Sequence, residues 1–416
     1  MHEGISRRQF SELLALGFAV PYTPPLQATG ANAFRIRTVT ASLIFDRQLD
    51  FKLMQSALNF LQKARQEFET EGYPVQTLRL ATQPLPEYLP DWMSAESRKK
   101  LQTLDSIATE AGVMLSLGPA ISGDAFPTEF PAWASHLIQT TTNTSFSANI
   151  ASRQWGLHGH TIAAAAHAIA HISKSTAGGE GNFRFAATAF CPAGTPFFPA
   201  AWFDTPLTFS MGLESPRLLL RGWHAGDSKG QVKAALVAAM DTALAPVEAL
   251  AKKIGRSQGR RYLGMDTSPA PGLDASIGEV IEALSGAPFG SASTLSTCAL
   301  LTDVLKGLSI KSCGYSGLML PVLEDTILAR RAAEGRYGVN ELLLYSSVCG
   351  TGLDVVPLAG DIPADRLAAL IGDVAALANK YQKPLSARLF PVPGKKPGEA
   401  VSFENPYLTD SIILRA

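Results

Sequence analysis

Short apolar runs alternate with helical patterns along most of the chain. The runs are rich in β-branched or apolar residues, which predicts strands, and apolar residues recurring every three or four positions predict amphipathic helices. The predicted strands are RIRTVTASLIF (35–45), VQTLRLATQ (75–83), VMLSLGP (113–119), FRFAATAF (183–190), LTFSMGL (207–213), RYLGM (261–265), SGLMLPVL (316–323), ELLLYSSV (341–348) and LSARLF (385–390). The predicted helices cover 51–70, 94–112, 159–174, 229–255, 276–285, 293–308 and 364–381. This alternation implies an α/β fold with substantial parallel pairing.

Length and charge narrow the class of protein. The chain has 416 residues, which exceeds the roughly 250–300 residues of one simple core, so two lobes or one large closed sheet are expected. No repeat or low-complexity linker divides it, and we expect one domain over 34–416. Its 36 basic and 36 acidic side chains balance and form no basic stripe, which argues against a nucleic-acid partner. We see no run of about 20 apolar residues, so no membrane span is expected in the mature protein.

The N-terminus has the features of an export signal. Arg7 and Arg8 follow Ser6, and a short apolar run covers 13–20 before a Pro-rich stretch. This pattern resembles a twin-arginine signal with a cleavage region near 31–33, so we exclude residues 1–33 from the fold. It predicts transport by the twin-arginine translocase to a periplasmic or extracellular location. The alternative is a cytoplasmic chain with an amphipathic first helix.

Five apolar segments end in small, polar or charged residues. In α/β proteins, the loops after the carboxyl ends of strands gather on one face and build the ligand site. The recurrence therefore predicts one shared mouth for these loops, although turns also attract Gly, Pro, Asp and Ser. The residues brought there would be Thr195, Asp266, Thr267, Ser268, Glu324, Asp325, Cys349, Asp354, Lys395 and Lys396.

Long strings in the second half of the chain carry a family resemblance. They are PFFPAAW, FSMGLES, DTSPAPGLDASIGEVIEALSGAPFG, CGYSGLMLPVLED, ELLLYSSVCGTGLDVVPLAGD and KPLSARLFPVPGKKPGE. Together they resemble the DUF711 family of uncharacterised proteins, also called UPF0210. The resemblance implies a fold like that of the pyruvate formate-lyase-like glycyl radical enzymes: a ten-stranded α/β barrel of two half-barrels, with a loop entering the interior. The C-terminal stretch lacks the glycyl radical motif, so we expect ionic rather than radical chemistry.

Cys349 is a candidate nucleophile. It precedes Gly350 and Gly352, which allow close backbone approach and free N–H groups that could hold an oxyanion or lower the pKa of a thiol. The alternative is a packed cysteine beside a turn, since cysteine is often buried. The other cysteines, Cys191, Cys298 and Cys313, show no CxxC spacing, so bridges and buried free thiols both stay open.

Three carboxylates are the other candidate catalytic groups. Asp266, Glu324 and Asp354 could divide acid and base roles or bind a hard cation, although Asp also caps helices and turns. Lys395 and Lys396 could clamp a carboxylate or phosphate, or be solvated loop residues.

Histidines in LHGHTIAAAAHAIAHIS suggest a metal pair. His167 and His171 are four residues apart and share a helix face with His160, but the glutamate of HExxH is missing. A polar stripe on an Ala-rich helix is the favoured explanation, and we assign no metal ligand. No Walker loop or dinucleotide motif is present, and no cofactor is identified.

Two classes of function remain. The first is an enzyme that acts on a small polar or anionic metabolite by acid/base or thiol chemistry, with Cys349, Asp354, Asp266 and Glu324 as catalytic groups. The second is an exported small-molecule binding protein. Several titratable groups converging on one site favour the enzyme. Homo-oligomer formation stays open. The substrate-binding candidates are Thr195, Thr267, Ser268, Asp325, Gly350, Gly352, Lys395 and Lys396.

Overall fold

The computed structural model describes residues 34–416 apart from 224–227 and 273, so the expected export signal, 1–33, lies outside the described residues. The strands are β1 Arg35–Leu43, β2 Val75–Thr82, β3 Met114–Ile121, β4 Thr144–Ser152, β5 Gly156–Leu157, β6 Phe185–Ala189, β7 Thr208–Glu214, β8 Arg261–Pro269, β9 Gly352–Ala359, β10 Leu385–Val392, β11 Ala400–Val401 and β12 Ser411–Ile412. The helices are α2 Phe51–Thr70, α3 Leu85–Tyr88, α4 Ala95–Glu110, α5 Phe130–Thr140, α6 Gly159–Ser175, the 3₁₀ helix η1 Ala177–Arg184, α7 Pro216–Arg221, α8 Lys229–Ser257, α9 Ile277–Ser285, α10 Thr294–Lys306, α11 Thr326–Ala333, α12 Val339–Ser346 and α13 Ala364–Tyr381.

A ten-stranded mixed sheet organises the chain. Its order is β8-β7-β1-β2-β3-β4-β6-β10-β9, with β5 paired to β4. The five strands from β1 to β6 in this order run parallel to one another. The pair β7 and β8 and the pair β9 and β10 are parallel within themselves, and they join this group through antiparallel contacts of β7 with β1 and of β10 with β6. The expected α/β fold with parallel pairing is confirmed at this level.

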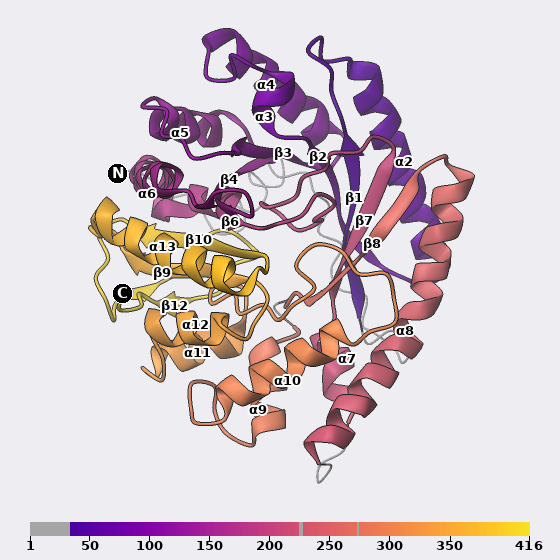
Figure 1. Ribbon diagram of the computed structural model, residues 1–416, viewed down its shortest axis with the longest axis vertical. Helices are drawn as coiled ribbons and strands as arrows, with labels where there is room; N and C mark the ends of the chain where they lie inside the picture. The colour runs from indigo at the N-terminus through magenta and orange to yellow at the C-terminus, as the bar shows by residue number, and fades with distance from the viewer. Residues whose placement is uncertain (1–33, 224–227, 273) are drawn as a thin grey trace, which may run out of the picture.

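The segment between α10 and α11 contacts strands at both ends of the sheet. Ser312 forms a parallel bridge to Met265 in β8, and Pro321 forms a parallel bridge to Asp354 in β9. In the described part of the chain β8 and β9 do not pair with each other. Figure 1 shows this segment, between α10 and α11, running through the middle of the molecule. The sheet therefore curves so that both ends reach one stretch of chain.

Helices cover the outside of the strands (Figure 1). The helix α2 begins where Asp50 accepts a hydrogen bond from the N–H of Lys52, and it buries Met54, Leu61 and Phe68 at helical spacing. The other long helices follow the same pattern, because a stripe of apolar side chains every three or four residues packs against the sheet. The predicted helices 51–70, 159–174 and 364–381 match α2, α6 and α13 to within one residue.

Among the described helices, α8 is by length and composition apolar enough to cross a membrane, which the sequence analysis did not single out. Its Leu236, Met240 and Leu244 are buried, while Ala238 and Ala245 are exposed. The helix packs on β8 and α10. In this fold α8 therefore covers the sheet.

Several parts of the secondary structure differ from the prediction. The predicted strand 341–348 is wrong: most of it is the helix α12, where Leu342 and Tyr345 are buried and Leu344 is 52% exposed, which is a helical repeat. The predicted strand 316–323 contributes an isolated bridge at Pro321. Strands β4 and β9 were not predicted as strands.

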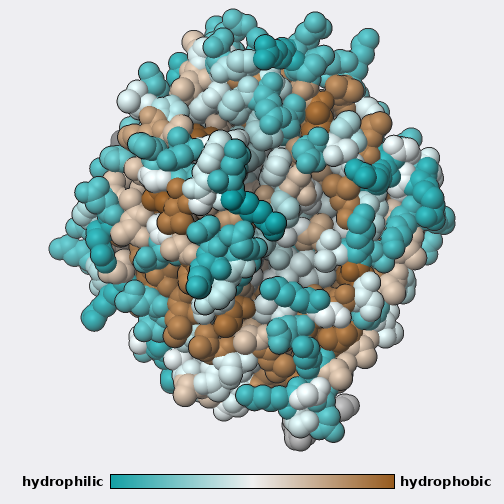
Figure 2. Space-filling model, in the orientation of Figure 1, coloured by the Kyte–Doolittle hydropathy of each residue, from teal (hydrophilic) through white to brown (hydrophobic). Residues whose placement is uncertain are grey.

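The molecular surface has mixed polarity. Figure 2 shows polar side chains spread over the visible face, with apolar side chains in several separate areas between them. This distribution fits the balanced charge of the sequence.

Candidate functional site

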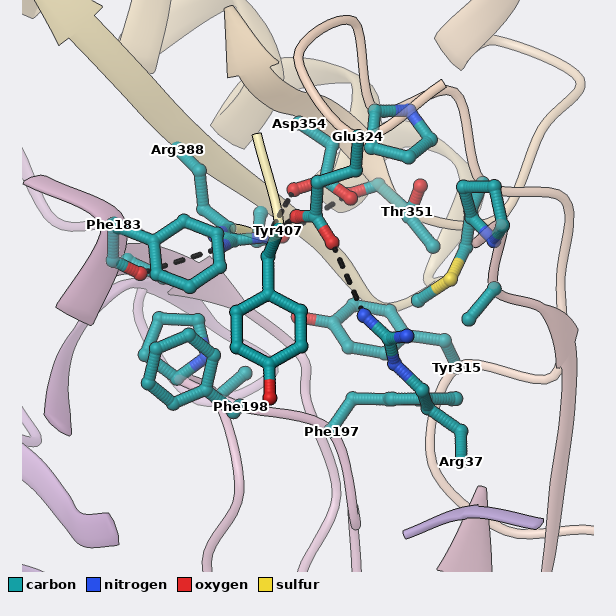
Figure 3. Close-up of a pocket in the computed structure, with 18 of the residues that line it drawn as sticks. Arg37, Phe183, Phe197, Phe198, Tyr315, Glu324, Thr351, Asp354, Arg388 and Tyr407 are labelled. Atoms are coloured by element: carbon teal, nitrogen blue, oxygen red, sulfur yellow. Dashed lines mark hydrogen bonds and ion pairs between the residues drawn. The ribbon is translucent and has the colours of Figure 1, made fainter. Parts of the chain in front are cut away.

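A cavity opens on one face of the sheet. About 750 Å³ of space lies between its walls when the solvent at its open mouth is counted. The segment that follows β6 and the segment between α10 and α11 contribute much of its wall, together with side chains from six strands. The lining residues are Arg37, Thr77, Arg79, Met114, Phe183, Ala186, Phe197, Phe198, Pro199, Ala200, Ala270, Pro271, Tyr315, Met319, Pro321, Glu324, Thr351, Asp354, Ser386, Arg388 and Tyr407. The lining thus combines an aromatic wall with three arginines and two carboxylates, and Figure 3 shows Arg37 and Arg388 beside the carboxylates of Glu324 and Asp354.

A β-bulge brings Asp354 and Arg388 together. In the pairing of β9 with β10, Leu353 lies opposite Ala387 and Val356 opposite Leu389, so two residues of β9 face one residue of β10. Val355 has φ of 41°, a left-handed conformation that a β-branched residue rarely adopts. Bulges re-aim side chains and are enriched beside active sites, and backbone strain also clusters there. The bulge is therefore a local sign of a site.

A second bulge lies at Arg37. On β1, Ile36 pairs with Leu213 of β7 and Thr38 pairs with Gly212, so Arg37 is the extra residue. Its guanidinium lies over the ring of Tyr407, 5.7 Å from the centroid. Two of the three arginines of the cavity are thus placed by irregular strand pairing.

The two carboxylates of the cavity are engaged by arginines. Arg388 Nη1 lies 2.8 Å from Asp354 Oδ1 and 3.1 Å from Glu324 Oε1. Arg37 Nη2 lies 3.6 Å from Glu324 Oε2, so Glu324 bridges the two guanidiniums (Figure 3). Arg37 also contacts the buried Glu214, at 3.3 Å. These contacts fix the positions of both acids.

The protonation of Glu324 is shifted by its surroundings. Burial raises the pKa of Glu324 against the opposing effect of Arg388, and the nearby Asp354 raises it further. Burial alone would lower the pKa of Arg388, but Asp354 and Glu324 reverse that effect and raise it. A carboxyl group with a raised pKa, held in a cavity, is suited to exchange a proton with a ligand.

Arg79 differs from the other two arginines. It is 5% exposed, and no acidic side chain of the described residues forms an ion pair with it. Nη1 donates to the carbonyl of Pro196 at 2.6 Å, Nη2 reaches only Met114 Sδ at 3.6 Å, and Nε has no partner. Burial, with repulsion from Arg37, lowers the pKa of Arg79 to about 9. A buried cation without a counterion is costly, so this arrangement indicates a site for an anion.

Arg184 shows that a buried arginine in this fold can have a full set of partners. Its guanidinium donates to the carbonyl oxygens of Ile138 and Thr144 and to the hydroxyl of Thr141. Three protein oxygens therefore receive its hydrogen bonds, whereas Arg79 has one such partner. Arg260, 6% exposed, also donates to a single carbonyl, that of Ser42 at 3.4 Å, but of these arginines it is Arg79 that lines the cavity.

Comparison with known proteins identifies the family. A family model described as "Uncharacterised ACR (DUF711)" matches residues 29–404. The chain belongs to the DUF711 family. It is 30% identical over 352 residues to a UPF0210 protein of Pyrobaculum arsenaticum, covering 79% of this chain and 76% of the relative. It is 28% identical over 403 residues to a UPF0210 protein of Oleidesulfovibrio alaskensis, covering 88% of each chain. The expected family membership is confirmed.

Of the residues singled out in this DUF711 sequence, two line the cavity, Glu324 and Asp354. Asp266 is fully buried and accepts hydrogen bonds from the N–H groups of Tyr315 and Ser316 and from Ser268. Ser268 accepts the N–H of Gly317, and the N–H of Thr267 donates to Ser316. These three residues hold the segment that carries Tyr315 into the cavity.

Cys349 lies in the main hydrophobic core, 1% exposed, beyond the end of α12. Its N–H donates to the carbonyl of Tyr345, and its carbonyl accepts from Lys383 Nζ at 2.6 Å. Gly350 packs directly against Gly317, and Gly352 packs against the backbone of Ser386. Close backbone packing explains both glycines, and it positions the cavity segments next to one another.

The remaining candidates lie away from the cavity lining. Asp325 caps α11 and also accepts from the N–H groups at the start of α9. Thr195 is buried and donates to the carbonyl of Pro192. Lys395 is half-buried and Lys396 is exposed. His167 and His171 are exposed, and the described residues contain no group of three or more potential metal-ligating side chains.

Five residues of the lining were not predicted from the sequence: Arg37, Arg79, Arg388, Tyr315 and Tyr407. The predicted site residues follow the ends of strands, whereas the three arginines lie within β1, β2 and β10. A signal was present, because arginine is rarely buried without a partner and each of these three interrupts an apolar strand.

Proposed function

We propose that the cavity is the active site of an enzyme that acts on a small anionic metabolite by ionic acid–base chemistry. One observation carries the proposal. The same cavity is lined by Arg79, which has no acidic partner among the described residues, and by Glu324, which is held by two other arginines. Arg79 supplies anion binding, and Glu324 supplies a proton donor or acceptor. Arg37 and Arg388 stabilise the negative charge that develops in the reaction.

Cys349 remains a proposed thiol participant only if its loop moves, since the nucleophile must reach the substrate. The acid–base route needs no such movement, because Glu324 lines the cavity. The acid–base route is therefore the first choice for this site.

An exported binding protein without turnover is the second candidate. The aromatic wall supports it, since rings with few polar groups are typical of binding pockets. The raised pKa of Glu324 favours the enzyme, because a passive site has no need of a shifted acid.

Three broader features belong to the same proposal. We propose that the sheet is a barrel of the pyruvate formate-lyase-like type with the cavity in its interior, supported by the bridges of one segment to β8 and β9. We propose one domain over 34–416, and export of the folded protein through the twin-arginine pathway, which the pattern around Arg7 and Arg8 supports.

A metabolite-consumption assay tests the function. Purified protein is incubated with a small-molecule extract, and compounds are followed by mass spectrometry. We expect wild type to consume an anionic compound and Glu324→Gln to slow this at least about 100-fold. Glu110→Gln, on the exposed face of α4, is the matched control. A compound bound but recovered unchanged would support the binding protein, and no bound or consumed anion would refute both.

A further inference from the structure

We propose that the anion recognised by Arg79 is a single carboxylate on a small molecule with an apolar or aromatic body, which enters by displacing Met114 from the edge of the guanidinium. The inference rests on the proposed function and names the substrate class for the same cavity. Three observations support a carboxylate ligand: the N–H groups of Arg79 that have no oxygen partner, the charges of the cavity lining, and the apolar side chains of the cavity wall.

The free edge of Arg79 has the shape of a carboxylate site. In a guanidinium, the Nε and Nη2 N–H groups point the same way and match the two oxygens of a carboxylate. Nη1 is the nitrogen held by the carbonyl of Pro196, so the edge formed by Nε and Nη2 is left without an oxygen partner.

Met114 covers this edge. Its Sδ lies 3.6 Å from Nη2, and Met114 itself lines the cavity. A thioether is a weak acceptor, and methionine is unbranched and adapts its conformation readily. A carboxylate therefore forms stronger hydrogen bonds with Arg79 than the sulfur does, and the methionine moves aside.

The charge of the lining favours one negative charge. Arg388 pairs with Asp354 and Glu324, and Arg37 pairs with Glu324 and Glu214, so among the described residues Arg79 is the arginine of the lining that has no ion pair. A phosphate carries more charge and needs more donors, often from a helix N-terminus. The helix that begins beside the cavity is α11, and Asp325 already accepts from its first N–H groups. A monocarboxylate therefore fits better than a phosphate.

The walls suit an apolar body. Phe197, Met319 and Pro271 line the cavity with no charged group of their own. Phe198 lies beneath the guanidiniums of Arg79 and Arg388, 5.4 and 5.7 Å from its ring centroid. An acid with a hydrocarbon or aromatic part buries apolar surface here, which acetate cannot do.

Calorimetric titration with benzoate, benzamide, acetate and inorganic phosphate tests the inference. Benzoate and benzamide have the same shape and differ in charge. We expect benzoate to bind at least about 10-fold more tightly than benzamide and acetate, and phosphate to bind more weakly than benzoate. We expect Arg79→Met to lose benzoate binding by at least about 10-fold and to keep or raise the thermal midpoint, because the buried charge is removed and Thr40 still donates to the carbonyl of Pro196.

If Arg79 instead serves to stabilise the fold, Arg79→Met would have a lower thermal midpoint than wild type. Arg79→Lys, which keeps the charge but loses the two-pronged edge, serves if the methionine variant does not fold, and we expect it to weaken benzoate binding as well. Tighter binding of phosphate than of benzoate, equal binding of benzoate and benzamide, or no binding of benzoate would overturn the inference. If the consumption assay then yields a phosphorylated compound whose loss depends on Glu324, the proposed function stands and only the carboxylate class fails.

Discussion

Arg388 and Asp354 meet across the bulge that joins β10 to β9, with Nη1 and Oδ1 2.8 Å apart. Both side chains are largely buried, and the rings of Phe183 and Phe198 lie against the guanidinium. The pair therefore depends on its geometry to offset the cost of removing two charges from water. Its position beside Glu324 makes it part of the cavity as well as part of the sheet.

Removing one member of this pair should destabilise the protein. In Asp354→Asn, Arg388 keeps only Glu324 as an acidic partner, and we expect a loss of about 3 kcal/mol in the free energy of unfolding. Urea denaturation followed by circular dichroism measures it. The double variant Asp354→Asn with Arg388→Met should recover part of the loss, since the guanidinium that lost Asp354 is then also removed. A single variant as stable as wild type would contradict this account.

The stability contribution of Asp266 should depend on pH. Burial raises the pKa of Asp266 to about 6, above its ordinary value of 3.8, despite the donors that surround it. The folded protein therefore holds this proton more tightly than the unfolded chain, and the resulting stability is fully present below about pH 4 and lost as the pH rises through about 6. We expect wild type to lose up to about 3 kcal/mol across this window relative to Asp266→Asn. A difference that is flat or rises with pH would refute this assignment.

None of the four cysteines should react quickly with alkylating reagents in the folded protein. Burial raises the pKa of Cys191 to about 12 and raises the pKa values of Cys298 and Cys313, while Cys349 is 1% exposed. Alkylation of each thiol is read by peptide mass spectrometry. A fast reaction at Cys349 in wild type would instead support the thiol route.

Lys383 should slow the alkylation of Cys349. Its Nζ donates to the carbonyl oxygens of Ser346, Ser347 and Cys349, so it closes the turn after α12. Lys383→Met removes these charged hydrogen bonds, and we expect a loss of roughly 2 kcal/mol in stability and faster alkylation of Cys349. Lys380→Met, which changes a neighbouring lysine on α13, is the control. Unchanged alkylation in Lys383→Met would show that the turn is held by other contacts.

Export should require the paired arginines. Replacing Arg7 and Arg8 by lysine keeps the charge but removes the twin-arginine pattern, so we expect the protein to stay in the cytoplasm of a host that has the pathway. Cell fractionation and immunoblotting measure the distribution. Equal export of the double-lysine variant would exclude this route.

The longest helices were the most predictable part of the fold. Apolar residues recur at helical spacing in α2, α6 and α13, and this pattern survives in the structure because those residues face the sheet. The run of 341–348 misled the prediction, since a short continuous apolar stretch fits a strand or a buried helix equally well. Strand β4, TSFSANIAS, was missed because its Ser, Thr and Asn residues are typical of a loop, although most of them are buried here.

The candidate site was predictable only in part. Glu324 and Asp354 follow apolar segments and were found by that rule, whereas Arg79 lies inside β2 and the rule passes over it. Whether Arg79 has a counterion depends on β10 and on the segment after β6, which lie far from it along the chain. That information comes from the tertiary arrangement, and no local pattern contains it.

The place of β10 in the sheet bears on how the protein is made. It is the last of the ten strands along the chain, yet it lies between β6 and β9 and carries Arg388. During synthesis, β1 to β6 can pair as they emerge, but β6 keeps an open edge until β10 arrives. Open edges template pairing with other chains. A ribosome that stalls before β10 would therefore release an aggregation-prone product without a complete cavity, and cells that make this protein need to protect or degrade that intermediate.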